Sequence, residues 1–273
     1  MTILALDYET RSPLDIQQVG LKPYAAKAEI TLAAWQVSGG PIQQWDLFEG
    51  TGPNTELNEL LRDPLVEKRA FNAPFEIEIS RVCSGIEPAP SEWVCTMAWA
   101  YARAFKGKMA DVSRQIGLPD DKQKRADGTR LITKFCAPPY ADPMKHPDDW
   151  ERSRDYNRQD VVAESAIADY LAPFPLTPEE RDTWAWDYQV NNRGIPIDLE
   201  ACHQAIDLAE RETEHLLDQI RSLTGVANPN SRDQLLAWLR AQGYPYDDLQ
   251  KATVERAARD PSPYQRVLEL RLM

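Results

Sequence analysis

Two acidic residues follow the first apolar run of the chain. Residues 2–6 read Thr-Ile-Leu-Ala-Leu, which predicts a buried strand, and Asp7-Tyr8-Glu9 comes directly after it. Because side chains alternate along a strand, Asp7 and Glu9 point to the same side. Two neighbouring carboxylates repel each other, and a divalent metal ion is their usual counter-charge. The pair indicates a metal site, while a solvated strand end is the alternative.

A third carboxylate is predicted at the start of a helix. Asn72 is a good N-cap, and Pro74 is tolerated only in a first helical turn. Glu76 therefore lies within about one turn of the helix start, just after a short predicted strand at residues 69–71. Strand ends that lead into helices are where open α/β sheets place their sites. The alternative is that Glu76 only complements the helix dipole.

A tyrosine and a fourth carboxylate share one face of a long predicted helix. The helix is expected from about Trp150 to Leu171, with Asp148 or Asp149 as its cap. Tyr156 and Asp160 are four residues apart, so they lie on the same face. The alternative for this pair is the edge of an amphipathic helix, with Tyr156 half buried.

The elements that must position these residues are strands interleaved with helices. A polar turn region at 11–24 leads to a predicted hairpin, with strands at 29–37 and 42–47. Short strands at 69–71 and 93–96 are each followed by a helical pattern. This alternation predicts an α/β fold in the first part of the chain.

A proline-rich stretch marks a change of structure near residue 175. Thr177, Pro178 and Glu180 form a capping box with proline at the first helical position. The sequence after it reads as helices alone, so we expect two domains, at 1–172 and 177–273. Met273 falls within apolar helix spacing without a terminal cap, so the second domain is expected to be incomplete.

Composition narrows the class of protein. The 273 residues carry a net charge of −12, with no long apolar run and no signal-peptide pattern. The four cysteines show no C-x-x-C spacing, which argues against zinc and favours a reducing, cytoplasmic location. Residues 103–134 hold nine basic side chains against four acidic ones. This stretch is a candidate phosphate contact, and a solvated surface is the alternative.

Taken in order, these motifs resemble the tyrosine branch of the DEDD family of 3′–5′ exonucleases. Asp7-Tyr8-Glu9 matches the first motif, residues 72–76 the second, and residues 156–160 the third. Glu76 departs from the aspartate that the family usually carries at its position. The segments at 192–198, 228–235 and 251–253 look like the region that joins exonuclease to polymerase, including the start of the thumb, in phage-type family A DNA polymerases.

The resemblance implies a fold, a reaction and a set of site residues. The fold would be a ribonuclease H-like mixed β-sheet flanked by helices, followed by an all-helical segment. The reaction would be hydrolysis of DNA from its 3′ end to nucleoside 5′-monophosphates, with two divalent cations, Mg²⁺ or Mn²⁺. Asp7, Glu9, Glu76 and Asp160 would hold the ions, and Tyr156 would orient the attacking water.

The resemblance also implies partners. A single-stranded or frayed DNA 3′ end is the expected substrate, and the palm and fingers of a polymerase would belong to the same or another chain. No membrane contact and no DNA synthesis by this chain alone are expected. An exonuclease that acts mainly on RNA and a DNA-binding module with a disabled site are the alternatives. Candidate DNA contacts are Asn72, Phe75, Lys106, Lys108, Lys122, Lys124 and Arg125.

Overall fold

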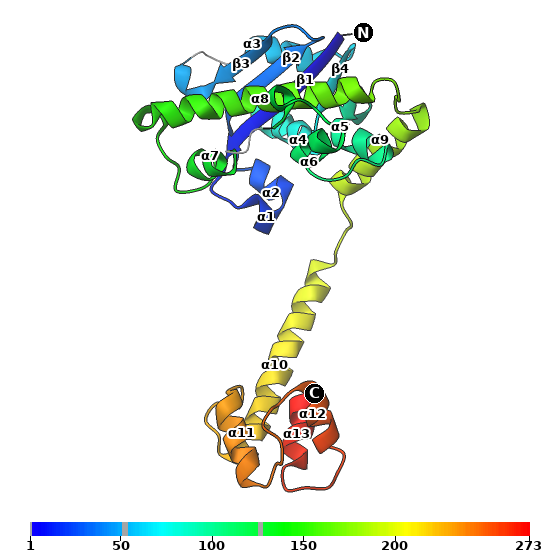
Figure 1. Cartoon of the computed structure of the whole chain (residues 1–273). Coiled ribbons are helices and arrows are strands. Elements are labelled where there is room, and N and C mark those ends of the chain that lie inside the picture. Colours follow the sequence, from blue (N-terminus) through cyan, green and yellow to red (C-terminus); the bar gives the residue numbers. More distant parts are fainter. Residues whose placement is uncertain (1, 51–53, 125–127) are drawn as a thin grey trace. The chain divides into compact units, whose positions relative to one another are not determined.

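The computed structural model describes residues 2–50, 54–124 and 128–273 (Figure 1). The chain forms two compact units, Met1–Gly194 and Ile195–Met273. Every residue of the predicted metal site lies in the first unit, which is built around a sheet.

The sheet of the first unit is mixed and has five strands. Their order is β3-β2-β1-β4-β5, with β1 in the centre. β1 pairs antiparallel with β2 and parallel with β4, β2 pairs antiparallel with β3, and β4 pairs parallel with β5. This arrangement, flanked by helices, confirms the predicted α/β, ribonuclease H-like fold and the predicted hairpin. The strands are β1 (Thr2–Arg11), β2 (Glu29–Val37), β3 (Ile42–Asp46), β4 (Val66–Ala70) and β5 (Trp93–Cys95).

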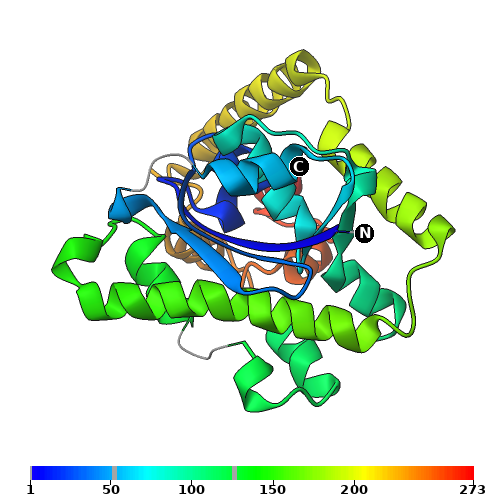
Figure 2. The same cartoon turned by 90° about the horizontal axis from the view of Figure 1, so that it is seen from above.

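The two faces of β1 are covered by different helices. Leu6 and Tyr8 belong to the main apolar core, to which α3 (Thr55–Arg62) and α4 (Ala73–Ser84) also contribute. On the opposite face, Ala5 packs against Val161 of α8 (Pro147–Leu171). Figure 2 shows the long green helix α8 on one side of the blue strand β1 and the cyan helix α4 on the other. The alternation of β1 therefore turns Asp7 and Glu9 toward α8.

The remaining helices of the first unit surround this sandwich. α5 and α6 share an apolar cluster with the second half of α8, and α7 packs against its first half. Short 3₁₀ helices occur at Leu47–Glu49, Pro90–Glu92, Asp120–Lys122 and Pro143–Lys145. The helices are α1 (Ile16–Val19), α2 (Leu21–Ala25), α5 (Thr96–Ala102), α6 (Met109–Gln115), α7 (Gly128–Phe135) and α9 (Pro178–Arg193).

Two sequence-based expectations about helices are wrong. The region at 11–24 is not only a turn, because it contains α1 and most of α2. Asp15 caps α1 by accepting a hydrogen bond from Gln17 N, and Gly20, with φ of 78°, separates the two helices. Helix α8 begins at Pro147 with His146 as its N-cap, so Asp148 and Asp149 lie in its first turn instead of capping it.

The boundary between the compact units follows Gly194, later in the chain than the domain boundary expected from the sequence. Trp184 and Tyr188 of α9 pack against the core of the first unit, and Arg181 Nη1 lies 2.9 Å from Glu67 Oε2 of β4. Helix α9 therefore belongs to the first unit, although the predicted capping box at Thr177 is present.

The second unit is entirely helical in its described residues, as expected. Its helices pack around a core that includes Ile220, Leu235, Leu239 and Leu268. None of the described helices of either unit is both long and apolar enough to cross a membrane. The helices are α10 (Leu199–Thr224), α11 (Arg232–Ala241), α12 (Lys251–Ala257) and α13 (Gln265–Leu272).

Candidate metal centre

Three of the four predicted carboxylates meet between β1 and α8. One carboxylate oxygen each from Asp7, Glu9 and Asp160 lies within 4.8 Å of the others. Asp160 is 2% exposed, whereas Asp7 and Glu9 are partly buried. We call these three residues the acidic cluster. Two of its members are separated from the third by about 150 residues, so it depends on the packing of α8 against the sheet.

Glu76 lies beside this cluster but is not part of it. The pairing of β4 with β1 is limited to residues 2–5 of β1; β4 ends at Ala70, and α4 begins three residues later. Glu76 sits in the first turn of α4, 5% exposed, with Oε2 lacking a hydrogen-bond partner among the described residues. Burial raises the pKa of Glu76 to about 8, and its negative charge contributes to the raised pKa of Asp7.

The acidic cluster holds more negative charge than the surrounding side chains offset. Burial, together with the charges of Asp160 and Glu9, raises the pKa of Asp7 well above its ordinary value. Burial and Asp160 raise the pKa of Glu9 to about 7. Asp160 Oδ1 is buried and has no hydrogen-bond partner in the described part of the chain. Hard oxygen donors at this spacing fit a divalent cation such as Mg²⁺ or Mn²⁺.

Among the residues that the structure describes, one basic side chain reaches the cluster. Lys124 forms an ion pair with Asp160, and its Nζ lies 4.7 Å from the centre of the Tyr156 ring. The sequence placed Lys124 among candidate DNA contacts, and the structure places it at the acidic cluster. Three other candidates, Lys106, Lys108 and Lys122, are exposed, and Arg125 lies outside the described residues.

Tyr156 is fully enclosed next to the cluster. It is 3% exposed, so it is more deeply buried than the amphipathic-edge alternative assumed. A Cβ atom on Gly128, the first residue of α7, would lie 2.1 Å from Tyr156 Cε2, so only glycine allows this approach. Burial and the charges of Asp160, Glu9 and Asp7 all raise the pKa of Tyr156, so its phenol stays protonated near neutral pH.

Asn157 is a site residue that the sequence analysis missed. Its Nδ2 donates to Asp7 Oδ2 at 2.8 Å and to the Asp7 carbonyl oxygen at 3.1 Å. Its Oδ1 accepts from Gln44 Nε2 of β3 at 3.0 Å, and Asn157 is fully buried. Asn157 therefore fixes the carboxylate of Asp7. A signal existed in the sequence, because Asn157 precedes Asp160 by three residues and shares its helix face.

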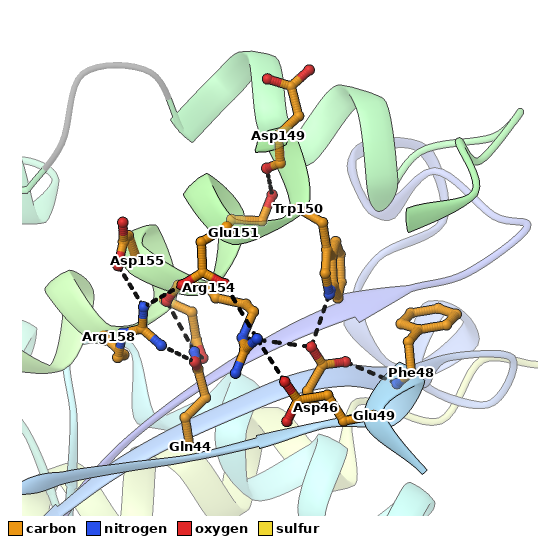
Figure 3. A network of polar contacts seen from close by, with 12 residues as sticks. Gln44, Asp46, Phe48, Glu49, Asp149, Trp150, Glu151, Arg154, Asp155 and Arg158 are labelled. Carbon is orange, nitrogen blue, oxygen red and sulfur yellow. Dashed lines mark hydrogen bonds and ion pairs between the residues drawn. The ribbon is translucent and has the colours of Figure 1, made fainter. Parts of the chain in front are cut away.

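Gln44 connects Asn157 to a network of charged residues along the N-terminal half of α8 (Figure 3). Its Nε2 donates to the carbonyl oxygen of Arg154 at 2.9 Å, and its Oε1 accepts from Arg158 Nη1 at 2.6 Å. Arg158 is held in turn by Glu151, at 3.0 Å, and by Asp155.

A second part of the same network joins α8 to the end of β3. Trp150 Nε1 donates to Asp46 Oδ2 at 2.8 Å, and Arg154 Nη1 lies 2.6 Å from Glu49 Oε1. Figure 3 shows Trp150 and Arg154 of α8 pointing toward Asp46 and Glu49. We call Gln44, Asp46, Glu49, Glu151, Arg154, Asp155 and Arg158 the paired network. It fixes α8 along the sheet, and Tyr156, Asn157 and Asp160 with it.

A groove of about 790 Å³ opens beside Glu9. Its walls include Ile16 and Val19 of α1, Phe75 of α4, and Ile132 and Cys136 near α7. This volume lies within the range of small-ligand pockets, and the apolar walls suit a flat aromatic group. Phe75, a predicted DNA contact, therefore lines a suitable groove, while Asn72 is exposed and its side chain makes no capping hydrogen bond.

Comparison with known proteins gives a relative that extends over nearly the whole chain. A DNA polymerase of Bacillus phage SP02 is 31% identical over 285 residues, which cover 99% of this chain and 44% of that protein. The chain thus spans less than half the length of this curated relative. No protein-family model matches.

The chain is also similar to solved structures of other proteins. NrnC of Brucella melitensis has a TM-score of 0.45 and 16% identity, covering 70% of this chain and 86% of its own. The POL domain of Pol1 from M. smegmatis, in complex with DNA primer-template and dNTP, has a TM-score of 0.51 and 14% identity. That match covers 98% of this chain and 43% of the other, and it concerns the fold alone.

The sequence match and the structure agree with the resemblance drawn from the motifs. The first unit has the predicted ribonuclease H-like fold, and the second unit is helical. The chain is a relative of a phage DNA polymerase, and its fold and the order of its motifs fit the exonuclease domain of such a polymerase.

Proposed function

We propose that the first unit is a metal-dependent 3′–5′ exonuclease that acts on DNA, as the proofreading part of a DNA polymerase. The observation that carries the proposal is the acidic cluster, which brings Asp7, Glu9 and Asp160 within 4.8 Å of one another and leaves Asp160 Oδ1 without a partner among the described residues. The relative of this chain, a phage DNA polymerase, supports DNA as the substrate.

Asp7, Glu9 and Asp160 would hold the divalent ions, with Glu76 acting on one of them from the start of α4. Bound there, two such ions would lower the pKa of a water molecule and offset charge on the leaving oxygen. Water would attack the terminal phosphorus while the bond to the 3′ oxygen of the preceding nucleotide breaks. The products would be a nucleoside 5′-monophosphate and a DNA chain shortened by one residue.

Tyr156 would orient the water and not act as a base. Its pKa is raised by burial and by the neighbouring carboxylates, so a phenolate is disfavoured near neutral pH. A protonated hydroxyl can still donate or accept one hydrogen bond at a fixed position. Asn157 would keep Asp7 in place, and the groove beside Glu9 would receive the terminal base near Phe75.

The test is hydrolysis of a 5′-labelled single-stranded DNA oligonucleotide with Mg²⁺ or with EDTA. We expect a ladder of fragments that shorten from the 3′ end, dependence on Mg²⁺, and no activity in Asp7→Ala. A matched RNA oligonucleotide measures the preference between the two nucleic acids. Cleavage in EDTA, or full activity of a folded Asp7→Ala protein, would contradict the proposal. Faster cleavage of the RNA than of the DNA oligonucleotide would identify RNA as the substrate.

A further inference from the structure

In the described part of the chain, a single ammonium group lies beside the three carboxylates of the acidic cluster. Lys124 is ion-paired with Asp160, and the charges of Asp7 and Glu9 also act on it. Its ammonium supplies part of the positive charge that the cluster needs.

The position of Lys124 conflicts with a filled metal site. Its Nζ contacts Asp160 Oδ2, while Oδ1 of the same carboxylate is the oxygen without a partner among the described residues. A divalent cation held by the same three carboxylates would lie within a few ångströms of the ammonium, and like charges at that separation repel strongly in a partly buried site. The two cations would therefore compete for the negative charge of one carboxylate group.

The surroundings of Lys124 allow it to leave. Its side chain is 28% exposed, whereas that of Asp160 is 3% exposed, so the ammonium is on the solvent side of the pair. Lysine has a long flexible stem and a compact charge, and it can change partners without moving the backbone. Asp160 lies in the middle of α8, which the paired network holds on the sheet.

We propose that Lys124 is an internal counter-cation, which gives up its ion pair with Asp160 when the site takes up metal and thereby weakens metal binding. This inference rests on the metal site of the proposed function. It assigns Lys124 a role at the acidic cluster itself, in place of the general DNA contact expected from the basic stretch. Once released, the ammonium is free to pair with an anionic group of the substrate.

Lys134 provides a matched control on the neighbouring helix α7. Its Nζ lies 2.7 Å from Asp149 Oδ2, and its side chain is 25% exposed, close to the 28% of Lys124. Asp149 is also paired with Arg130, at 3.0 Å, and is not a member of the acidic cluster. Both lysines thus form one partly buried ion pair, and only Lys124 faces the proposed metal ligands.

The first experiment is calorimetric titration of the DNA-free protein with Mn²⁺. We expect Lys124→Met to bind Mn²⁺ about tenfold more tightly than the parent, because a competing positive charge is gone. Lys134→Met should bind Mn²⁺ as the parent does, and Lys124→Arg should bind it more weakly than Lys124→Met. Equal or weaker binding by Lys124→Met would overturn the inference while leaving the metal site in place. A parent that binds no Mn²⁺ would overturn the proposed metal site as well.

The second experiment needs no variant, so it remains decisive if Lys124→Met fails to fold. The parent protein is labelled with an amine-reactive reagent with and without Mn²⁺, and peptides are quantified by mass spectrometry. We expect Mn²⁺ to increase the labelling rate of Lys124 several-fold and to leave that of Lys134 unchanged. Unchanged or slower labelling of Lys124 in a protein that binds Mn²⁺ would overturn the inference.

Discussion

Helix α8 contacts the sheet through two polar regions, which differ in how their carboxylates are paired. In the paired network, Glu49, Glu151 and Asp155 each contact a basic side chain of α8, and Asp46 accepts from Trp150 Nε1. In the acidic cluster, Lys124 is the one basic side chain of the described residues that forms an ion pair, and its partner is Asp160. Each carboxylate of the first region has a basic or indole partner, whereas those of the second face one another with a single described lysine beside them.

The two regions therefore have different effects on the stability of the folded protein. Opposite charges with hydrogen bonds hold α8 in register on β3, which favours the folded state. Buried carboxylates that face each other oppose folding, as the raised pKa values of Asp7, Glu9 and Glu76 indicate. Such an arrangement is expected where binding of a cation supplies the missing charge. Substitutions in the two regions should therefore have opposite signatures.

The largest expected effect is the loss of hydrolysis in Asp7→Ala. Removing one of the proposed metal ligands should lower the rate by at least about a thousandfold, corresponding to several kcal/mol of transition-state stabilisation. Its stability without metal should not fall, because a source of repulsion is removed. Single-turnover hydrolysis and urea unfolding in EDTA measure the two effects.

Asp46→Ala in the paired network is the matched control with the opposite signature. Asp46 is 2% exposed and accepts from Trp150 Nε1 and from Phe48 N, both at 2.8 Å. Its loss should cost about 2–4 kcal/mol of unfolding free energy, because buried donors lose their partner. The rate of the folded fraction should change far less than in Asp7→Ala. Equal signatures for the two variants would remove the distinction between the regions.

Gly128→Ala should displace Tyr156 without altering any carboxylate. The new Cβ would lie 2.1 Å from the ring, so the ring or α7 must move. We expect hydrolysis to slow by about 10- to 1,000-fold, the range also expected for Tyr156→Phe, on the scale of a lost positioning hydrogen bond. Mn²⁺ binding should persist in both variants. The exposed neighbour Thr129, replaced by alanine, serves as control, and wild-type kinetics of Gly128→Ala would refute this role for the ring.

Asn157 joins the two regions, and its replacement tests whether the paired network positions the cluster. In Asn157→Ala, Asp7 Oδ2 loses a 2.8 Å hydrogen bond. The rate should fall about 10- to 100-fold, because small displacements of reacting groups carry costs of this size. Gln44→Ala should show a smaller loss of the same kind, since it acts through Asn157. The effect should appear in kcat and not in KM, and a change in KM alone would assign Asn157 to substrate binding.

The sequence was most informative where function depends on local pattern. Asp7 and Glu9 could be placed on one face because a strand has a period of two, and Tyr156 and Asp160 because a helix has 3.6 residues per turn. The central strand, the hairpin and the order of the motifs followed from such patterns. The roles of Glu76 and of the other site residues remain predictions.

Contacts between distant segments could not be read in this way. Lys124 reaches Asp160 from a loop 36 residues earlier, and Gly128 meets Tyr156 only because α7 packs on α8. The basic stretch at 103–134 suggested a surface, yet one of its lysines turns toward the carboxylates. Helix α1 could not be predicted from its polar stretch, because a helix of four residues is too short to show the helical spacing of apolar residues.

The smallest expected effect concerns Glu164, one turn beyond Asp160 on α8. It is 2% exposed, its Oε1 accepts from Thr96 Oγ1 at 2.5 Å, and its Oε2 has no partner among the described residues. Burial raises the pKa of Glu164 to about 7 from an ordinary value of 4.5. Between these values the folded state holds a proton that the unfolded state releases, so the stability from this group is full below pH 4.5 and is lost as the pH rises through 7.

Glu164→Gln should therefore flatten the dependence of stability on pH. Glutamine cannot ionise and keeps a carbonyl oxygen for Thr96, so its advantage over the parent should grow by about 2–3 kcal/mol between pH 5 and pH 8.5. Urea unfolding in EDTA at several pH values measures this difference. Glu151→Gln, on the same helix but half exposed and ion-paired with Arg154 and Arg158, serves as the control for replacing a glutamate of α8. Parallel curves for parent and Glu164→Gln would mean that Glu164 is ionised in the folded protein, and that the uncompensated charge on α8 is confined to the acidic cluster.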